Sequence, residues 1–193
     1  MNTLKNIAVF CGSNNGSNPE FCVAARTLGG LLARQGIGLV YGGGNMGVMG
    51  ELARAVMSGG GRAIGVIPER LNDVVDHTGL TELIVVSTMH ERTRRMYELA
   101  DGFIILPGGI GTMEEFFEIF TWQQIGYHEK PIGLLEVLDF FQPLFALLDH
   151  MVESGFFKLE HRQSLVHSQN AELLLQTLQS SRPHLVPKFP ERK

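Results

Sequence analysis

Short apolar runs alternate along the chain with longer amphipathic segments. The runs are closed by glycine, proline or asparagine, which is typical of buried strands. We expect strands at about residues 7–11, 37–41, 62–68, 81–86, 102–106 and 131–137. The segments between and after them carry apolar residues at helical spacing. They predict helices at about residues 19–35, 46–58, 89–100, 113–125, 140–153 and 171–179.

This alternation defines a fold class. Strands that are continuously apolar, and that alternate with helices, indicate a mainly parallel sheet with helices on both faces. We therefore expect a single doubly wound, Rossmann-like α/β domain over residues 1–181, followed by a loosely held tail over residues 182–193. Ligands of such folds bind at the carboxyl ends of the strands. Glycine-rich loops start there at Gly12, Gly42 and Gly108.

The amino-acid composition limits the kinds of partner that the protein is expected to bind. Hydrophobic residues make up 44% and charged residues 19% of the 193, and the net charge of −4 predicts no general attraction to nucleic acid or to anionic membranes. No apolar run is long enough for a spanning helix. Cys11 and Cys22 lack metal-type spacing and the histidines form no cluster, so we expect a cytoplasmic protein with reduced thiols, no metal and no cofactor.

The loop at Gly108 is the strongest candidate for an anion site. Gly108, Gly109 and Gly111 allow backbone amides to point inward, and the positive end of a helix follows Thr112. The loop lacks the Lys-Ser/Thr ending of a P-loop, which argues against nucleoside-triphosphate hydrolysis.

Glu115 has two interpretations. As a structural residue, it completes a capping box in which Thr112 is the N-cap and Glu115 folds back onto its amide. As a functional residue, it belongs to an acidic pair with Glu114 that would repel an anion. That pair indicates a ligand with a cationic or proton-demanding part, and we favour the functional interpretation.

Arg92 lies on the apolar stripe of the predicted helix 89–100, with Met89, Met96 and Leu99. An arginine in such a stripe either extends to solvent or is paired. The sharper hypothesis places Arg92 against a carboxylate or a phosphate near Glu115.

The segment Gly42-x-Gly44-x-x-Gly47 is compatible with another class of protein, a dinucleotide-binding enzyme. It follows a strand, opens a helix and precedes an acidic residue, Glu69, as a dinucleotide-binding loop does. It lies in the second βα turn rather than the first, so an NAD-dependent oxidoreductase is a weaker alternative. A non-catalytic nucleotide-binding module is the other.

With these residues assembled, the chain resembles the Lonely Guy family of cytokinin riboside 5′-monophosphate phosphoribohydrolases. Residues 107–115 meet its PGGxGTxxE signature, and residues 42–50, Met89-His90-Glu91-Arg92, Thr121-Trp122 and Lys130-Pro131 fit its other motifs. The likeness runs from about residue 7 to residue 157. One departure is Thr93, where the family usually has lysine.

The resemblance implies hydrolysis of the N-glycosidic bond of a purine ribonucleoside 5′-monophosphate, either an N6-substituted (cytokinin-type) adenine nucleotide or AMP, by a homodimer. Arg92 and Glu115 would be catalytic. The substrate and its phosphate would be bound by Ser13, Gly43, Gly44, Gly108, Gly109, Ile110, Gly111, Thr112, Glu114 and Thr121. Relatives are often labelled lysine decarboxylases, but this chain has no lysine in a strand-end loop to hold pyridoxal phosphate.

Overall fold

The computed structural model describes residues 4–72 and 79–181. The predicted tail, 182–193, lies outside the described residues. The strands are β1 (Asn6–Phe10), β2 (Gly38–Tyr41), β3 (Ala63–Pro68), β4 (Glu82–Val86), β5 (Gly102–Ile105), β6 (Ile132–Leu135) and β7 (Val166–Ser168). The helices are α1 (Glu20–Arg34), α2 (Gly47–Ser58), α3 (Glu69–Asn72), α4 (Met89–Leu99), α5 (Ile110–Gln124), α6 (Gln142–Glu153), α7 (Leu159–Ser164) and α8 (Ala171–Ser180).

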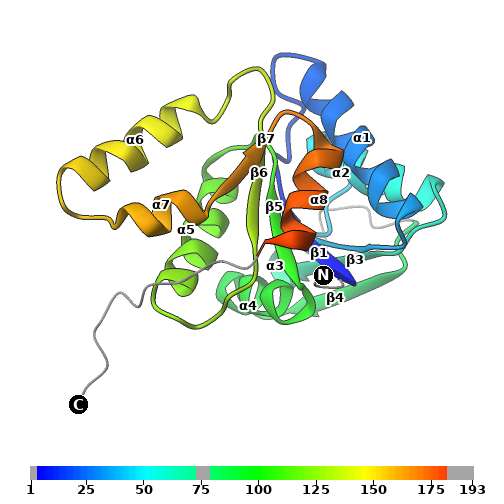
Figure 1. Cartoon of the computed structure of the whole chain (residues 1–193). Helices are drawn as coiled ribbons and strands as arrows, with labels where there is room; N and C mark the ends of the chain where they lie inside the picture. Colours follow the sequence, from blue (N-terminus) through cyan, green and yellow to red (C-terminus); the bar gives the residue numbers. More distant parts are fainter. Residues whose placement is uncertain (1–3, 73–78, 182–193) are drawn as a thin grey trace.

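The strands form one sheet in the order β4-β3-β2-β1-β5-β6-β7, and every described pair is parallel. The chain winds outward from β1 to β4 and then returns to the other side of β1 at β5 (Figure 1). The order of strands therefore reverses between β1 and β5, and a doubly wound sheet opens a crevice at the carboxyl ends of such a strand pair. The predicted α/β fold class is confirmed.

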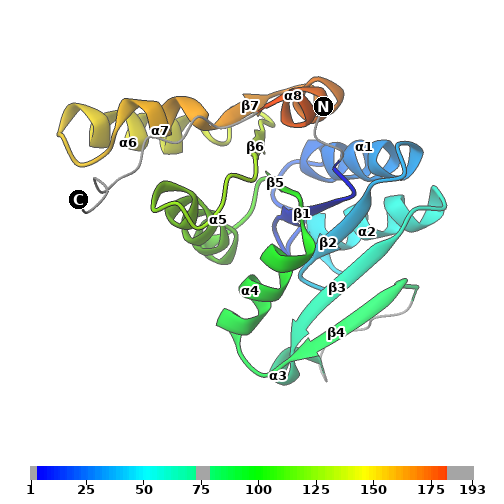
Figure 2. The ribbon, with the colours of Figure 1, turned by 60° about the horizontal axis from the view of Figure 1, so that its bottom comes forward.

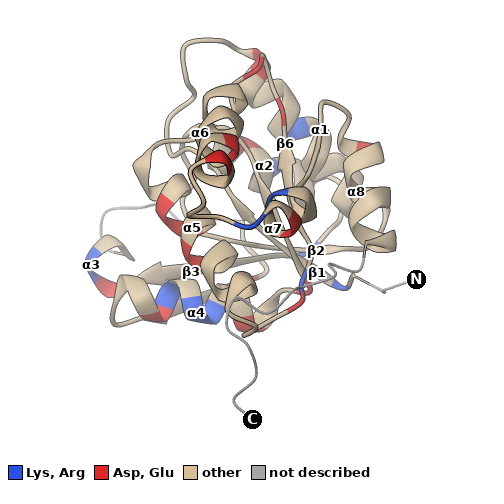
Figure 3. Cartoon of the chain, turned by 60° about the vertical axis from the view of Figure 1, so that its left-hand side comes forward, with Lys and Arg blue, Asp and Glu red and all other residues tan. Residues whose placement is uncertain are grey.

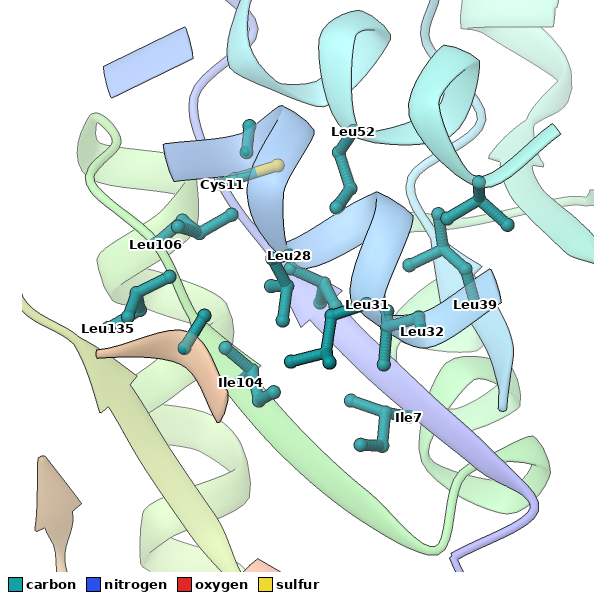
Figure 4. Packing of buried hydrophobic residues seen from close by; sticks show 14 of the residues in the cluster. Ile7, Cys11, Leu28, Leu31, Leu32, Leu39, Leu52, Ile104, Leu106 and Leu135 are labelled. Atoms are coloured by element: carbon teal, nitrogen blue, oxygen red, sulfur yellow. The ribbon is translucent and has the colours of Figure 1, made fainter. Parts of the chain in front are cut away.

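Both faces of the sheet are buried, as the side chains of β1 demonstrate, because successive residues of this strand pack into different cores. Ile7 and Val9 pack into a core shared with α1, α2 and α8, whereas Ala8 and Phe10 pack into a second core under α4, α5 and α6. Successive side chains of a strand point to opposite faces, so a strand covered on both sides must be apolar throughout. The two layers of helices are visible in Figure 2, and Figure 4 shows the first core, where leucines of α1 lie over β1 and β5.

The predicted strands and helices are present, with three additions. The pattern missed α3, α7 and β7, all short. β7 is only three residues long and includes His167, so it has no apolar run to reveal it. No helix among the described residues has both the length and the apolar composition needed to span a bilayer.

Candidate active site

The loops after β1 and β5 meet at the switch point. The amide of Gly12 donates to the carbonyl of Pro107 at 3.1 Å, and the amide of Met49 donates to the carbonyl of Gly12 at 3.0 Å. The loop after β2 joins them, because Gly42 and Gly44 line the same cavity as Gly12. This cavity has a volume of about 350 Å³. We call it the crevice; its lining comprises Cys11, Gly12, Ser13, Gly42, Gly44, Met49, Ile67, Leu71, Met89, Arg92, Gly109, Ile110, Gly111, Thr112 and Glu115.

Gly108 allows the two central loops to approach closely. A Cβ atom at this position would lie 2.8 Å from the amide nitrogen of Gly12 and would also overlap the side chain of Thr112. Real Cβ atoms essentially never come so close to backbone. Glycine is therefore required here to bring the loop after β5 against the loop after β1.

Helix α5 starts earlier than predicted, and this changes the role of Thr112. The helix begins at Ile110 with Gly109 as its N-cap, and its first turn closes with a 3.2 Å hydrogen bond from the Met113 amide to the Gly109 carbonyl. The structural alternative for Glu115, a capping box with Thr112 as the N-cap, is therefore wrong. The amides of Ile110, Gly111 and Thr112 precede the first intrahelical bond and border the crevice.

Glu115 is ion-paired with Arg92 instead, and this tertiary contact replaces the local cap. A guanidinium nitrogen of Arg92 donates to Oε1 of Glu115, and the two residues are 9% and 7% exposed. Nε of Arg92 is buried and has no hydrogen-bond partner among the described residues. The predicted contact of Arg92 with a carboxylate is thus confirmed.

Local capping fixes the start of α4, which carries Arg92. The hydroxyl of Thr88 accepts from the amide of Glu91 at 3.1 Å, and the Glu91 carboxylate accepts from the amide and hydroxyl of Ser87. Met96, one turn beyond Arg92, is fully buried under the sheet. The apolar stripe therefore turns the arginine inward, towards α5.

Burial raises the pKa of the Glu115 carboxyl to about 7. The charge of Arg92 and its hydrogen bond oppose this rise, whereas the neighbouring Glu114 and Glu118 reinforce it. Desolvation disfavours the ionised form, and here it outweighs the attraction of the guanidinium. A carboxyl that titrates near neutral pH can exchange protons during catalysis.

The other predicted binding residues divide into two groups. Ser13 and Gly44 line the crevice, with the loop residues 109–112. Gly43 instead packs inward, where a Cβ atom would lie 3.3 Å from Ile67. Glu114 and Thr121 are exposed on α5 and do not belong to the crevice lining.

Comparison with known proteins fits this arrangement. A family model described as "Possible lysine decarboxylase" matches residues 49–178. A protein of Oryza sativa subsp. japonica, named probable cytokinin riboside 5′-monophosphate phosphoribohydrolase LOGL1, is 47% identical over 92% of this chain and 81% of its own length. LOG2 of Arabidopsis thaliana, named as the same type of hydrolase, is 43% identical over 93% of this chain and 85% of its own length. The chain belongs to the Lonely Guy (LOG) family.

Solved structures agree with the fold. A molybdenum cofactor binding protein from Rippkaea orientalis superposes with a TM-score of 0.70 over 91% of this chain and 95% of its own, at 24% identity. An identity this low supports the shared architecture alone.

The described lysines of this LOG-family chain, Lys5, Lys130 and Lys158, lie away from the crevice. Lys5 precedes β1 and Lys130 precedes β6, so both sit at the opposite edge of the sheet, where Nζ of Lys130 donates to the carbonyl of Tyr97 at 2.6 Å. Lys158 directly precedes α7. No described lysine lines the crevice, and no described group of His, Cys, Asp and Glu could hold a metal ion.

Thr93, which replaces the family's usual lysine, is buried on α4. Its hydroxyl donates to the carbonyl of Met89, one turn earlier, at 3.4 Å. Arg94 and Arg95 do not replace the missing charge, because both are exposed and both pair with Glu98. Figure 3 shows this mixed charge along the outer side of α4.

Sequence reasoning missed the apolar wall of the crevice. Met49, Ile67, Leu71 and Met89 form it, from α2, β3, α3 and α4. Met49 lies in the glycine motif after β2, and its sulfur approaches Gly44 closely enough that a Cβ there would be 3.0 Å away. The family motifs contain Met49 and Met89, whereas Ile67 and Leu71 join them only through the fold.

Proposed function

We propose that this protein hydrolyses the N-glycosidic bond of a purine ribonucleoside 5′-monophosphate, giving the free base and ribose 5-phosphate. The observation that carries the proposal is the buried Arg92–Glu115 pair beside the first turn of α5. It places a carboxyl with a pKa of about 7 and an unpartnered donor next to backbone amides suited to phosphate. The names of the relatives support the same reaction.

The reaction requires stabilisation of the positive charge that develops at C1′ of the ribose. As the bond to the base breaks, positive charge develops on the ribose in an oxocarbenium-like transition state. Ionised Glu115 offsets this charge and accepts a proton from the attacking water, whose oxygen becomes the new hydroxyl at C1′. The base leaves with the bonding electrons and gains one proton, which is matched by the proton that Glu115 takes from water and then releases, so that one water supplies both the hydroxyl and the proton. Arg92 holds the carboxylate in place, through the ion pair that its guanidinium makes with Glu115.

The phosphate occupies the start of α5 in this proposal. The amides of Ile110, Gly111 and Thr112 are the donors, and Ser13 borders them from the loop after β1. Binding at the phosphate, away from the reacting bond, supplies energy that positions the ribose against Glu115. Loss of the phosphate from the substrate should therefore reduce kcat as well as affinity.

The base lies against the apolar wall of the crevice. Met49, Leu71 and Met89 are suited to an adenine ring or to an alkyl group on its N6 atom, because methionine adapts to irregular apolar shapes. We propose that both AMP and N6-alkylated nucleotides enter. Rates of base release from a panel of monophosphates with and without N6 substituents will rank them.

The central experiment compares Glu115→Gln with Glu118→Gln, one turn further along α5. Incubation with AMP or isopentenyladenosine monophosphate should release ribose 5-phosphate from the wild type and from Glu118→Gln. Glu115→Gln should lose about 10²–10⁴-fold in kcat/KM, the range that positioned acid–base groups contribute. Nucleotide binding without base release in the wild type would identify a carrier module instead.

We also propose that the active form is a cytoplasmic homodimer. Exposed apolar side chains flank the crevice, including Ile110 at 87%, Val85 at 45% and Met89 at 39%. A second copy would cover them. The two cysteines are unpaired and buried, which suits a reducing compartment. Light scattering after size exclusion should give twice the 21.3 kDa chain mass, and Ile110→Asp should give a monomer.

A further inference from the structure

A second cavity lies at the carboxyl end of β6, beyond the crevice. It has a volume of about 430 Å³ and is enclosed by the first turns of α1, the loop between β6 and α6, and the start of α8. These segments lie together at the upper side of the molecule in Figure 1. We call it the Glu136 pocket. It shares no lining residue with the crevice.

Glu136 is the buried carboxylate of this pocket. The residue is only 4% exposed, and its Oε1 accepts a hydrogen bond from the amide of Phe141 at 2.9 Å. Its Oε2 is buried and has no hydrogen-bond partner among the described residues. Removing a carboxylate oxygen from water without a hydrogen-bond partner costs free energy, so a ligand that donates a hydrogen bond to this atom would be favoured.

Other residues that line the Glu136 pocket add to its negative charge. Glu20 and Asp139 add carboxylates at the mouth, and the lining contains no lysine, arginine or histidine. Within residues 4–72 and 79–181, the side-chain donor to Asp139 is the amide of Gln169, at 3.5 Å. The positive ends of α1 and α8 offset part of this charge, but neither helix supplies a hydrogen bond to Oε2 of Glu136.

The remaining lining selects the type of cation. Val23, Ala24, Leu135 and Leu138 provide apolar surface beside the carboxylates. No group of described acidic, histidine or cysteine side chains has the arrangement of a metal site. A cavity that combines one buried carboxylate with apolar walls suits a charged N–H donor on a short hydrocarbon chain.

We propose that the Glu136 pocket binds an organic cation, an alkylammonium or alkylguanidinium, whose N–H donates to Oε2 of Glu136. The alkyl part packs against Val23 and Leu138, and Asp139 and Glu20 attract the cation to the mouth. The site is independent of the nucleotide reaction. Phe21 and Phe140, whose rings meet edge to face at 6.0 Å, line a further cavity that shares Gly12, Ser13 and Gly109 with the crevice.

The test is calorimetric titration of the whole protein at constant ionic strength with n-butylammonium and n-butylguanidinium, using n-butanol as the neutral analogue. We expect saturable binding of one cation per chain and no saturable heat with n-butanol. Glu136→Gln should weaken the cation about tenfold or more, the effect of losing one charge-assisted hydrogen bond. The control Glu172→Gln, exposed on α8 and outside the lining, should bind as the wild type does.

A second variant protects the test against misfolding of Glu136→Gln. Thr27 lines the pocket from an exposed position on α1, so Thr27→Lys places a built-in ammonium there without altering Glu136. It should abolish binding of the added cations while retaining the helical circular dichroism of the wild type. The proposal is overturned if the wild type shows no saturable binding, or if both variants bind as the wild type does. Base release from AMP remains a separate assay, so failure here leaves the proposed hydrolysis unaffected.

Discussion

Glu115 and Glu136 are both buried carboxylates near the carboxyl edge of the same sheet, yet their surroundings differ. Glu115 has a guanidinium partner in Arg92, whereas Glu136 has one backbone amide and an oxygen with no partner in the described part of the chain. The first arrangement supplies its own countercharge and keeps the carboxyl poised for chemistry. The second lacks a countercharge, which is why we assign it to ligand binding. Burial alone therefore does not identify a catalytic acid; the groups that face it do.

The largest expected effect is on stability when the countercharge of Glu115 is removed. Arg92→Met leaves an unpaired buried carboxylate and should lower the free energy of unfolding by about 3–5 kcal/mol at pH 8. The loss should be smaller at pH 5, because a carboxyl with a raised folded-state pKa is then protonated. Urea denaturation at both pH values measures this.

The double variant Arg92→Met/Glu115→Leu provides the control. With both charges gone it should recover most of the stability but none of the turnover. If Arg92→Met alone is as stable as the wild type at pH 8, Glu115 tolerates isolation as Glu136 does, and the comparison fails.

Substitutions that change the backbone constraints should have opposite effects on stability at the crevice and at the Glu136 pocket. Gly108→Ala drives a methyl group into Gly12 and Thr112, and should cost about 1–3 kcal/mol. Leu138, beside the Glu136 pocket, has a φ of 52°, a conformation that glycine adopts without strain. Leu138→Gly should therefore raise stability by up to about 1 kcal/mol. Thermal unfolding of both variants tests the contrast; equal signs would contradict it.

The pH dependence of turnover isolates Glu115. Because the ionised form is proposed to act, kcat/KM should fall about tenfold per pH unit below the pKa of about 7 and level off above it. Glu136→Gln should show the same profile, because Glu136 takes no part in the reaction. A rate that instead rises as pH falls would make Glu115 a general acid.

The smallest effect concerns Glu136 without any added amine. Glu136→Gln preserves the acceptor for the Phe141 amide and replaces a buried carboxyl group with a neutral amide. Stability should rise by up to about 1 kcal/mol in amine-free buffer. A clear loss in chemical denaturation would mean that Oε2 already has a partner.

The sequence predicted the fold well because its signals are local. Each buried strand is an apolar run, and each long helix has a stripe. The local pattern allowed two outcomes for Arg92, because an arginine between Met89 and Met96 either extends to solvent or is paired, and the structure shows the pair. Thr112 shows the limit: its spacing to Glu115 fits a cap, but the ion pair across helices takes the carboxylate.

The Glu136 pocket was beyond sequence reasoning for a similar reason. Glu136 directly follows β6 and looks like the polar end of a strand. Its burial depends on α1, which comes more than a hundred positions earlier in the chain, and on the loop that turns back at Leu138. No short segment of the sequence contains both Glu136 and the α1 residues that bury it.

The pairing of β1 with β5 also bears on how activity is acquired. Ile7 lies opposite Gly102, so the two loops that meet at Gly12 and Pro107 come from distant parts of the chain. Loop closure over such a distance makes folding slow compared with helix formation. During refolding, helical signal should therefore return before turnover does. Turnover then requires the central strand pair, and a nascent chain lacks Glu115 until synthesis has passed β5 and entered α5.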